Sequence, residues 1–299
     1  MLDRETVRGI VAAGHAVPAG RSVEELTPPL LAALGSPDPV VREPAPKIVD
    51  VWIERGLYAP AAMRAMAARM ADNLAAGLGE RDTDSVFLRA FSLLVLTSIV
   101  SRDNTHPFYD AGDMRDILDR VLHYAAAERD LRGYIPGKGW AHAVAHTADI
   151  LWALASNRHL EAADLGRVLD AIAVLVAPPV AHIYLHNEDE RLAHAALGVL
   201  HRDLAPPPAV ATWLERLVRP DGRDLGFAAL LSQPDVAMRH NTIAFLRGLY
   251  FQLAGLAYDP DTLPPGLPGY ISDQIRQAPR HANDALPRIA AALRAIGVF

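Results

Sequence analysis

The sequence of 299 residues contains no cysteine, and lysine occurs only at Lys47 and Lys138. The lack of cysteine excludes disulfide bonds, thiolate metal ligands and a cysteine nucleophile. A chain without disulfides fits a cytoplasmic protein, which is the location we expect. The first residues, Met1-Leu2-Asp3-Arg4-Glu5, also lack the basic and then apolar order of a signal peptide.

Positive charge and long apolar runs are scarce as well. The formal net charge is -6, whereas proteins that bind the nucleic-acid backbone usually carry a basic face, so nucleic acid is the least expected partner. The most apolar runs, 91–100 and 168–181, are shorter than the about 20 residues that a membrane span needs. We therefore expect no membrane segment and interpret both runs as buried helices.

Signals for β-strands are almost absent, whereas helical periodicity is nearly continuous. Ser22 and Glu25 form a capping-box pattern, and Pro44 and Pro46 should kink a helix or delay its start. The predicted helices are 4–16, 22–34, 38–56, 60–78, 84–101, 114–127, 140–156, 160–176, 188–204, 208–218, 225–231, 238–257 and 284–296.

A faint internal repeat indicates how these helices are arranged. Asp38 precedes Arg42 by four residues at a turn before an apolar helix, and Asp235 precedes Arg239 in the same way. In HEAT-type repeats such an Asp accepts from helix amides, and the Arg reaches the Asp of its neighbour. The sequence therefore predicts an all-α fold: a HEAT-like α-solenoid of stacked antiparallel helix pairs. We expect one curved domain over 1–299, with a strap and cap helices at 258–299.

The densest group of unusual residues lies between 130 and 149. Its three glycines and one proline predict a tight loop, after which a helix opens near Trp140. On that helix His142, His146 and Asp149 would lie at i, i+4 and i+7, on one face. Two imidazoles at i and i+4 can reach one divalent metal, so His142 and His146 are candidate metal ligands.

Further metal ligands would have to come from elsewhere, and the candidates are His182, His186, Glu188 and Glu190. Without a metal, Asp149 could orient His146 as a general acid or base, which makes these two residues the candidate catalytic pair. The alternative is that the histidines are hydrogen-bonded groups between stacked helices. The sequence leaves these interpretations open.

The glycine loop also suggests an anion site. Arg132 and Lys138 could hold a small anionic group together with free helix amides, and Trp140 could line the site. The alternative is that the glycines only shape a turn, that Trp140 fills the core and that Arg132 pairs with Asp130. A glycine loop without a full phosphate fingerprint does not decide between them.

Other polar residues in apolar helices are candidate ligand contacts. They are Asp84, Arg89, Asn241, Arg247 and Tyr250. Asp84 also suits a helix cap, and Asn187 with Glu190 suits a capping pair that would explain the acidic run 188–190. We hypothesise that the segments around Arg89, His146 and Asn241 line one pocket.

Several of these stretches resemble an uncharacterised bacterial family that is catalogued only as a domain of unknown function. The resemblance is carried by Asp130-Leu131-Arg132-Gly133-Tyr134, Gly137-Lys138-Gly139-Trp140-Ala141-His142 and Ala145-His146-Thr147-Ala148-Asp149. It covers roughly residues 30 to 255, and Pro44 and Pro46 depart from its pattern. It implies an all-helical, HEAT-like protein and no particular activity.

The sequence therefore predicts a helical-repeat binding protein with a concave polar site around His142, His146 and Asp149. Its partner would be a small anionic molecule or a peptide or protein segment. The alternative is a small-molecule enzyme that uses acid–base chemistry at His146 and Asp149, or a His-ligated divalent metal. Nucleophile motifs, phosphate loops and dinucleotide fingerprints are absent from the sequence.

Overall fold

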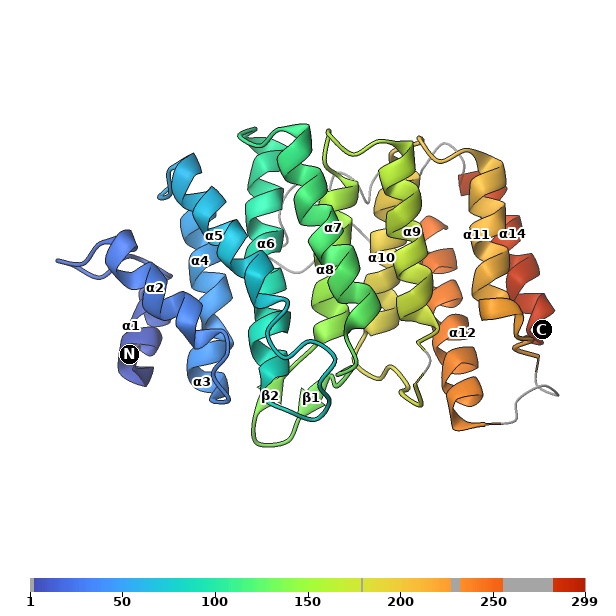
Figure 1. The fold of residues 1–299 in the computed structure, drawn as a ribbon, viewed down its shortest axis with the longest axis horizontal. Helices are drawn as coiled ribbons and strands as arrows, with labels where there is room; N and C mark the ends of the chain where they lie inside the picture. Colours follow the sequence, from blue (N-terminus) through green and yellow to red (C-terminus); the bar gives the residue numbers. More distant parts are fainter. Residues whose placement is uncertain (1–2, 179, 227–231, 255–281, 299) are drawn as a thin grey trace. The chain divides into compact units, whose positions relative to one another are not determined.

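The computed structural model describes residues 3–178, 180–226, 232–254 and 282–298. The chain forms two units, Met1–Asn157 and Arg158–Phe299, and each is described by itself. Helices dominate both units (Figure 1), which confirms the predicted all-α class. The prediction of a single domain stays a prediction.

The first unit contains eight helices among its described residues and one short hairpin. Its elements are α1 (Arg4–Ala12), α2 (Val23–Ala33), α3 (Pro39–Arg42), α4 (Pro44–Glu54), α5 (Pro60–Asn73), α6 (Ser85–Thr105), α7 (Ala111–Ala127), β1 (Tyr134–Ile135), β2 (Gly139–Trp140) and α8 (Ala143–Ala155). Helices α4, α6 and α8 follow one another in one layer, and α5 and α7 pack against α6 and α8 in the other (Figure 1).

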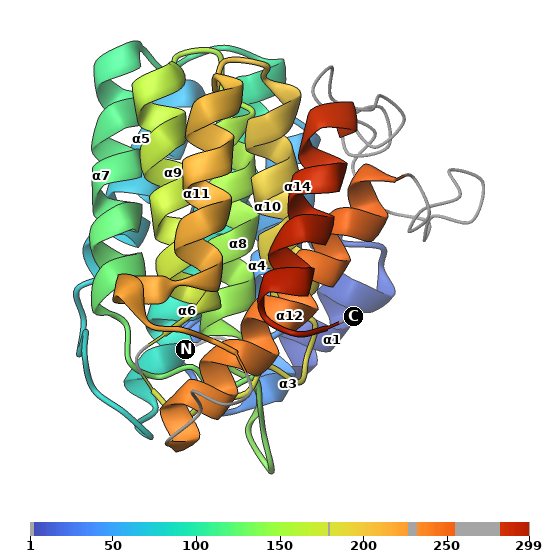
Figure 2. The same ribbon diagram turned by 90° about the vertical axis from the view of Figure 1, so that its right-hand side faces the viewer.

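The second unit repeats this two-layer packing. Its described elements are α9 (Ala162–Val176), α10 (Glu188–His201), α11 (Pro207–Val218), the 3-10 helix η1 (Pro220–Gly222), α12 (Gln233–Leu253) and α14 (Ala282–Ala295). Helix α10 packs between α9 and α12, while α11 packs on α9, and α14 packs on α11 and α12 (Figure 2). Neighbouring helices thus pack in succession within each unit.

The helices begin where their sequences allow it. The capping box of Ser22 and Glu25 is present at the start of α2, as predicted. Helices α3, α4 and α5 each begin with a proline, a residue whose missing N–H costs nothing in the first turn. The break between α3 and α4 falls just before Pro44, so the prediction that proline interrupts this helix is confirmed.

Two features of the secondary structure differ from the prediction. Several helices are shorter than predicted; α1 ends at Ala12, and α8 begins at Ala143 instead of Trp140. The short hairpin was not predicted, because strands of two residues give no readable alternation. The strap predicted at 258–270 lies outside the described residues, as does most of the helix predicted at 225–231.

Helix α6 is the central helix of the first unit, with neighbours on α4, α5 and α8. It is 21 residues long, and it alone among the described helices is long and apolar enough to cross a membrane. The apolar run 91–100 lies within this helix, so the length expected from that run alone was too short. Of its most apolar window, 61% is buried within the protein, and a core helix passes the same test.

Candidate functional site

A hairpin replaces the simple loop predicted between 130 and 140. Tyr134 pairs with Trp140 and Ile135 with Gly139 in antiparallel register. Gly137 and Gly139 both have φ of 77°, a left-handed conformation that disfavours residues with a Cβ. The hydrogen bond from the Ala141 N–H to the Gly133 carbonyl, at 2.8 Å, extends the hairpin toward α8.

The outer edge of β2 is covered by two side chains from the junction of α3 and α4. The Trp140 N–H donates to Oε1 of Glu43 at 3.0 Å. Arg42 Nη2 donates to the carbonyls of Trp140, at 3.2 Å, and of Lys138. Together Arg42 and Glu43 occupy hydrogen-bonding positions that a neighbouring strand would otherwise fill.

This contact requires glycine at position 139. A Cβ at Gly139 would lie 2.1 Å from Oε1 of Glu43 and 3.0 Å from Cβ of Pro39. A Cβ at Gly137 would meet nothing within 4 Å. The two glycines therefore share a backbone conformation but have different surroundings.

Arg42 itself is fully buried. Its guanidinium lies 3.8 Å from the ring centroid of Phe87, and its remaining hydrogen bond goes to the Ser36 carbonyl at 2.7 Å. Burial lowers the pKa of Arg42, and the charges of Glu43 and Asp38 offset this only in part. Arginine makes such a contact well because its charge is delocalised over a flat, weakly hydrated group.

The predicted Asp–Arg ladder between repeats is wrong for this arginine, because its hydrogen bonds go to backbone carbonyls. Asp38 does accept from the amide of Val40 at the start of α3, as predicted. Its ionic partner is Arg4, whose Nε lies 2.7 Å from Asp38 Oδ2. That hydrogen bond to Arg4 is the main cause of the lowered pKa of Asp38.

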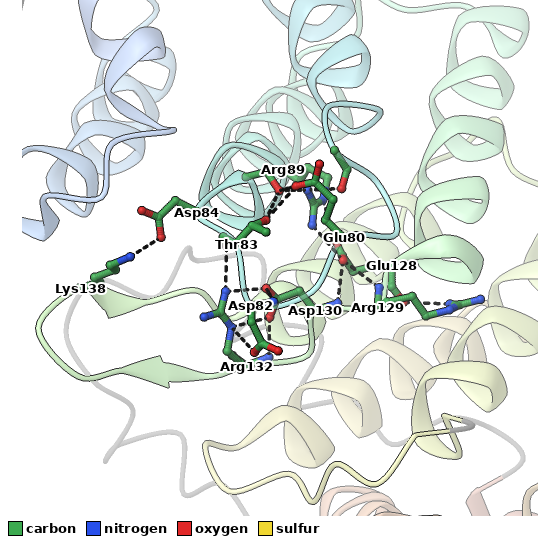
Figure 3. A network of polar contacts seen from close by, with 12 residues as sticks. Glu80, Asp82, Thr83, Asp84, Arg89, Glu128, Arg129, Asp130, Arg132 and Lys138 are labelled. Carbon is green, nitrogen blue, oxygen red and sulfur yellow. Dashed lines mark hydrogen bonds and ion pairs between the residues drawn. The ribbon is translucent and has the colours of Figure 1, made fainter.

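A second set of charges fixes the chain just before the hairpin (Figure 3). Arg89, which is fully buried on α6, donates from Nε and Nη2 to the two oxygens of Glu128, at 2.6 and 3.0 Å. Its Nη1 donates to the carbonyls of Ala76 and Gly77 and to Oγ of Ser85. Burial alone would lower the pKa of Arg89, but Glu128 more than offsets this and the pKa is raised.

The chain continues from this ion pair into another one. Asp130 is buried, and its two oxygens accept from Nε and Nη2 of Arg132 at 2.7 and 2.6 Å. Arg132 Nη2 also donates to the Thr83 carbonyl at 2.8 Å, and the hydrogen bond with Asp130 raises the pKa of Arg132. At the turn of the hairpin, Lys138 Nζ donates to Asp84 Oδ1 at 2.6 Å (Figure 3).

These contacts agree with the alternative to an anion site, in which the glycines shape a turn and Arg132 pairs with Asp130. Arg132 pairs with Asp130, and Lys138 pairs with a carboxylate, so an anion would have to compete with both pairs for either cation. Asp84 stands at the N-cap position of α6, but its side chain makes no capping hydrogen bond. The capping interpretation of Asp84 was therefore wrong, because its carboxylate reaches Lys138 instead.

A row of rings runs from the hairpin toward the core, and we call it the aromatic row. It consists of Tyr134, Trp140, His142, His146 and Phe91. Successive ring centroids are separated by 5.0, 4.2, 5.7 and 5.3 Å. Tyr134 is 51% exposed, whereas His146 is 7% exposed and Phe91 is 3% exposed, so the row connects the surface to the interior.

The two histidines are neighbours for a different reason than predicted. His142 is not on the helix: it is the residue before α8, and its φ of 52° is left-handed. This backbone turns its ring onto Trp140 on one side and toward His146 on the other. His146 Nδ1 lies 3.1 Å from the Ala90 carbonyl. Because a carbonyl only accepts, Nδ1 carries the proton in this contact.

The structure gives little support to a metal at these histidines. Their rings are stacked, with an interplanar angle of 29°, and stacked rings present faces to each other instead of converging nitrogen lone pairs. Among the residues that the structure describes, no group of three or more His, Asp or Glu side chains could hold a metal ion. Asp149 lies half-buried on α8, one turn beyond His146.

The remaining predicted contacts, Asn241, Arg247 and Tyr250, lie on α12 of the second unit. Asn241 is fully buried; its Oδ1 accepts from the Tyr184 N–H at 3.0 Å, and its Nδ2 donates to the His182 carbonyl at 2.9 Å. The amide of Asn241 is thus bonded within the second unit, and its role as a ligand contact stays a prediction. Arg247 is exposed and Tyr250 half-buried. A pocket shared with His146 stays a prediction.

The acidic run at the start of α10 is organised differently than predicted. Asn187 has a left-handed φ of 64° and makes no side-chain capping bond, so the predicted cap with Glu190 is wrong. The cap-like contact comes from Glu188, which is buried and accepts from the His186 N–H at 2.8 Å. Burial raises the pKa of Asp189 next to it.

The fold and this site define an all-α protein in which a short hairpin and buried ion pairs interrupt successively packed helices. The chain belongs to the family described as "Protein of unknown function (DUF2785)", whose model matches residues 74–251. That range includes the hairpin, the two ion pairs and all but the last two residues of α12. Comparison with curated proteins found no match, and comparison with solved structures found none either.

Proposed function

We propose that this protein is a HEAT-like helical-repeat binding protein, and that the aromatic row forms its ligand-binding surface in the first unit. The observation that carries this proposal is the exposed start of the row on a hairpin that buried charges hold in place. Tyr134 is 51% exposed, and Trp140 next to it is half-buried. Aromatic side chains of this kind supply large contact area at low conformational cost.

The surroundings of the hairpin support a preorganised surface. Arg42 and Glu43 bond its β2 edge, Lys138 bonds Asp84 at its turn, and Arg132 bonds Asp130 at its base. A surface that is already ordered loses little entropy when a ligand binds. Because both cations are paired with carboxylates, this geometry favours contacts to the rings over the capture of a small anion.

A second candidate is acid–base catalysis at His146. It is favoured by the Ala90 carbonyl, which lies 3.1 Å from Nδ1 and fixes the orientation and tautomer of the imidazole. Asp149 one turn away would tune this base. Such a site would lose turnover in His146→Gln but would keep ligand binding at Tyr134, which separates the two functions.

Tryptophan fluorescence tests the binding proposal, because Trp52, Trp152 and Trp213 are 0%, 4% and 1% exposed and Trp140 is half-buried. We expect ligands from a panel of metabolites and short peptides to change the Trp140 emission and its quenching by acrylamide. Trp140→Phe should remove this signal.

Binding of the same ligands by an independent method, such as isothermal calorimetry, should weaken at least about tenfold in Tyr134→Ser. The matched control is Leu57→Ser, which changes another exposed apolar residue of the first unit, 40% exposed. Equal affinity in the wild type and in Tyr134→Ser, or no response to any member of the panel, would contradict the proposal.

A further inference from the structure

The two edges of the hairpin are unequal. The Ala141 N–H donates to the Gly133 carbonyl, so Gly133 and Ala141 form a hydrogen-bonded pair. Pairs alternate along an antiparallel ladder, so the next pair, Tyr134 and Trp140, is a non-hydrogen-bonded pair. In such a pair the N–H and C=O of both residues point away from the hairpin. The contacts of Trp140 agree with this geometry, because its N–H bonds Glu43 and its C=O bonds Arg42.

Tyr134 has the same backbone orientation on the opposite edge but no such partners among the described residues. Neither its N–H nor its C=O makes a hydrogen bond with any residue that the structure describes. Its ring is packed edge-to-face on Trp140, and the residue is 51% exposed. One position therefore combines an outward backbone donor, an outward backbone acceptor and an exposed aromatic ring.

The neighbouring positions limit the length of this free edge. The Arg132 carbonyl already accepts from the His142 N–H at 3.2 Å. Pro136, on the other side, has no N–H to offer. The edge thus presents one residue that can exchange two hydrogen bonds with a partner, next to a carbonyl that is already bonded and a proline that can only accept.

We propose that this edge binds an extended peptide segment of another protein, by strand addition at Tyr134. One peptide residue donates its N–H to the Tyr134 carbonyl and accepts from the Tyr134 N–H, and a flanking peptide side chain covers the Tyr134 and Trp140 rings. An outward N–H and C=O on one strand residue match the backbone of an extended chain. This inference rests on the proposed function, because it names the class of ligand for the same surface.

Arg42 and Glu43 determine which edge of the hairpin a peptide can join. They bond the β2 edge, so strand addition is confined to β1. Figure 3 shows the hairpin held at its turn by Lys138 with Asp84 and at its base by Arg132 with Thr83. The free edge lies between two fixed points, and the peptide meets a strand that is already extended.

The experiment uses a phage-displayed library of random heptapeptides, selected on the full-length protein. Enriched peptides are synthesised with each backbone amide in turn replaced by its N-methyl form, which removes a single donor. Strand addition at one residue predicts that methylation of one amide weakens binding at least about tenfold, while methylation at the others changes it less than about threefold. Tyr134→Phe should bind as the wild type does, and Tyr134→Ala should bind more weakly.

Amide hydrogen exchange by NMR gives an independent reading. The Tyr134 amide should exchange fast in the free protein and become protected when the peptide binds. Peptides that bind through Trp140 but show no sensitive amide and no protection of Tyr134 would overturn strand addition and leave the binding function standing. If light scattering shows a dimer and the Tyr134 amide is protected by that dimer, the partner strand is a second copy of this chain, and the proposal of a peptide from another protein is refuted. If no peptide is enriched, the proposal of peptide binding is also refuted. The binding function proposed for the aromatic row is then decided by the fluorescence test with metabolites.

Discussion

The buried ion pair between Arg89 and Glu128 offers the sharpest test of how this structure is held together. Glu128 Oε1 accepts from Arg89 Nη2 and from the amides of Arg129 and Asp130, at 3.0, 2.8 and 2.8 Å, and Oε2 accepts from Arg89 Nε at 2.6 Å. In Glu128→Gln, one of these oxygens becomes an NH2 group that faces a donor, and the charge of Arg89 stays buried without its counterion.

We expect Glu128→Gln to lower the free energy of unfolding of the first unit by about 3–5 kcal/mol, the usual cost of removing one partner of a buried pair. The matched control is Asp72→Asn, which breaks the ion pair with Arg120. Those two side chains are 70% and 53% exposed, and exposed pairs contribute at most about 1 kcal/mol. The double variant Arg89→Met/Glu128→Gln should lose less than the sum of the single variants.

Urea unfolding followed by tryptophan fluorescence measures these changes in a Trp213→Phe background. In that background the emitting residues are Trp52, Trp140 and Trp152, which all belong to the first unit. A loss below about 1 kcal/mol in Glu128→Gln, equal to that in Asp72→Asn, would refute the view that this pair is a buried and fully bonded element.

Three further variants test other parts of the structure. Gly139→Ala should destabilise the first unit by clearly more than Gly137→Ala in urea unfolding, because both have φ of 77° but only at position 139 would the new Cβ lie 2.1 Å from a carboxylate oxygen. Burial lowers the pKa of His194 from 6.5 to about 4. As the pH falls, this histidine therefore binds a proton in the unfolded chain before it does so in the folded protein. The free energy of unfolding should decrease by about 3 kcal/mol between pH 6.5 and pH 4. His194→Gln should remove that part of the pH dependence, and an unchanged acid profile would speak against it. Asn241→Ala should destabilise the second unit by about 1–3 kcal/mol, since two backbone groups lose their partner, whereas the exposed Arg247→Ala on the same helix should change stability by at most about 0.5 kcal/mol in thermal unfolding.

The sequence was sufficient to predict the all-α class, because helical periodicity depends on residues that are close together in the chain. It also located the capping box at Ser22 and the break before Pro44. Each of these features follows from local chemistry. The pairing of Arg132 with Asp130 was open as an alternative for the same reason, since the two residues are neighbours.

The parts that could not be predicted depend on contacts over long sequence separations. Arg42 bonds carbonyls 96 and 98 residues away, and no local pattern reveals that a buried arginine covers a strand edge. Glu128 follows α7 in an ordinary stretch, and only the fold brings it to Arg89. His142 was assigned to a helix because its spacing to His146 fits one, yet the left-handed residue before α8 brings the rings together equally well. The spacing of the two histidines thus predicted that they are neighbours, but not that His142 lies outside the helix or that the two rings are stacked.

The scarcity of two residue types has a practical consequence for work on the hairpin. Lys138 at the hairpin turn and Lys47 on α4 are the only side-chain amines in the sequence, so an amine-reactive dye or cross-linker has few places to attach. A Lys47→Arg background would direct such a label to the hairpin, at the cost of its contact with Asp84. The absence of cysteine permits a second, orthogonal label at any engineered thiol, so distances from the hairpin to each unit become accessible to energy-transfer measurements.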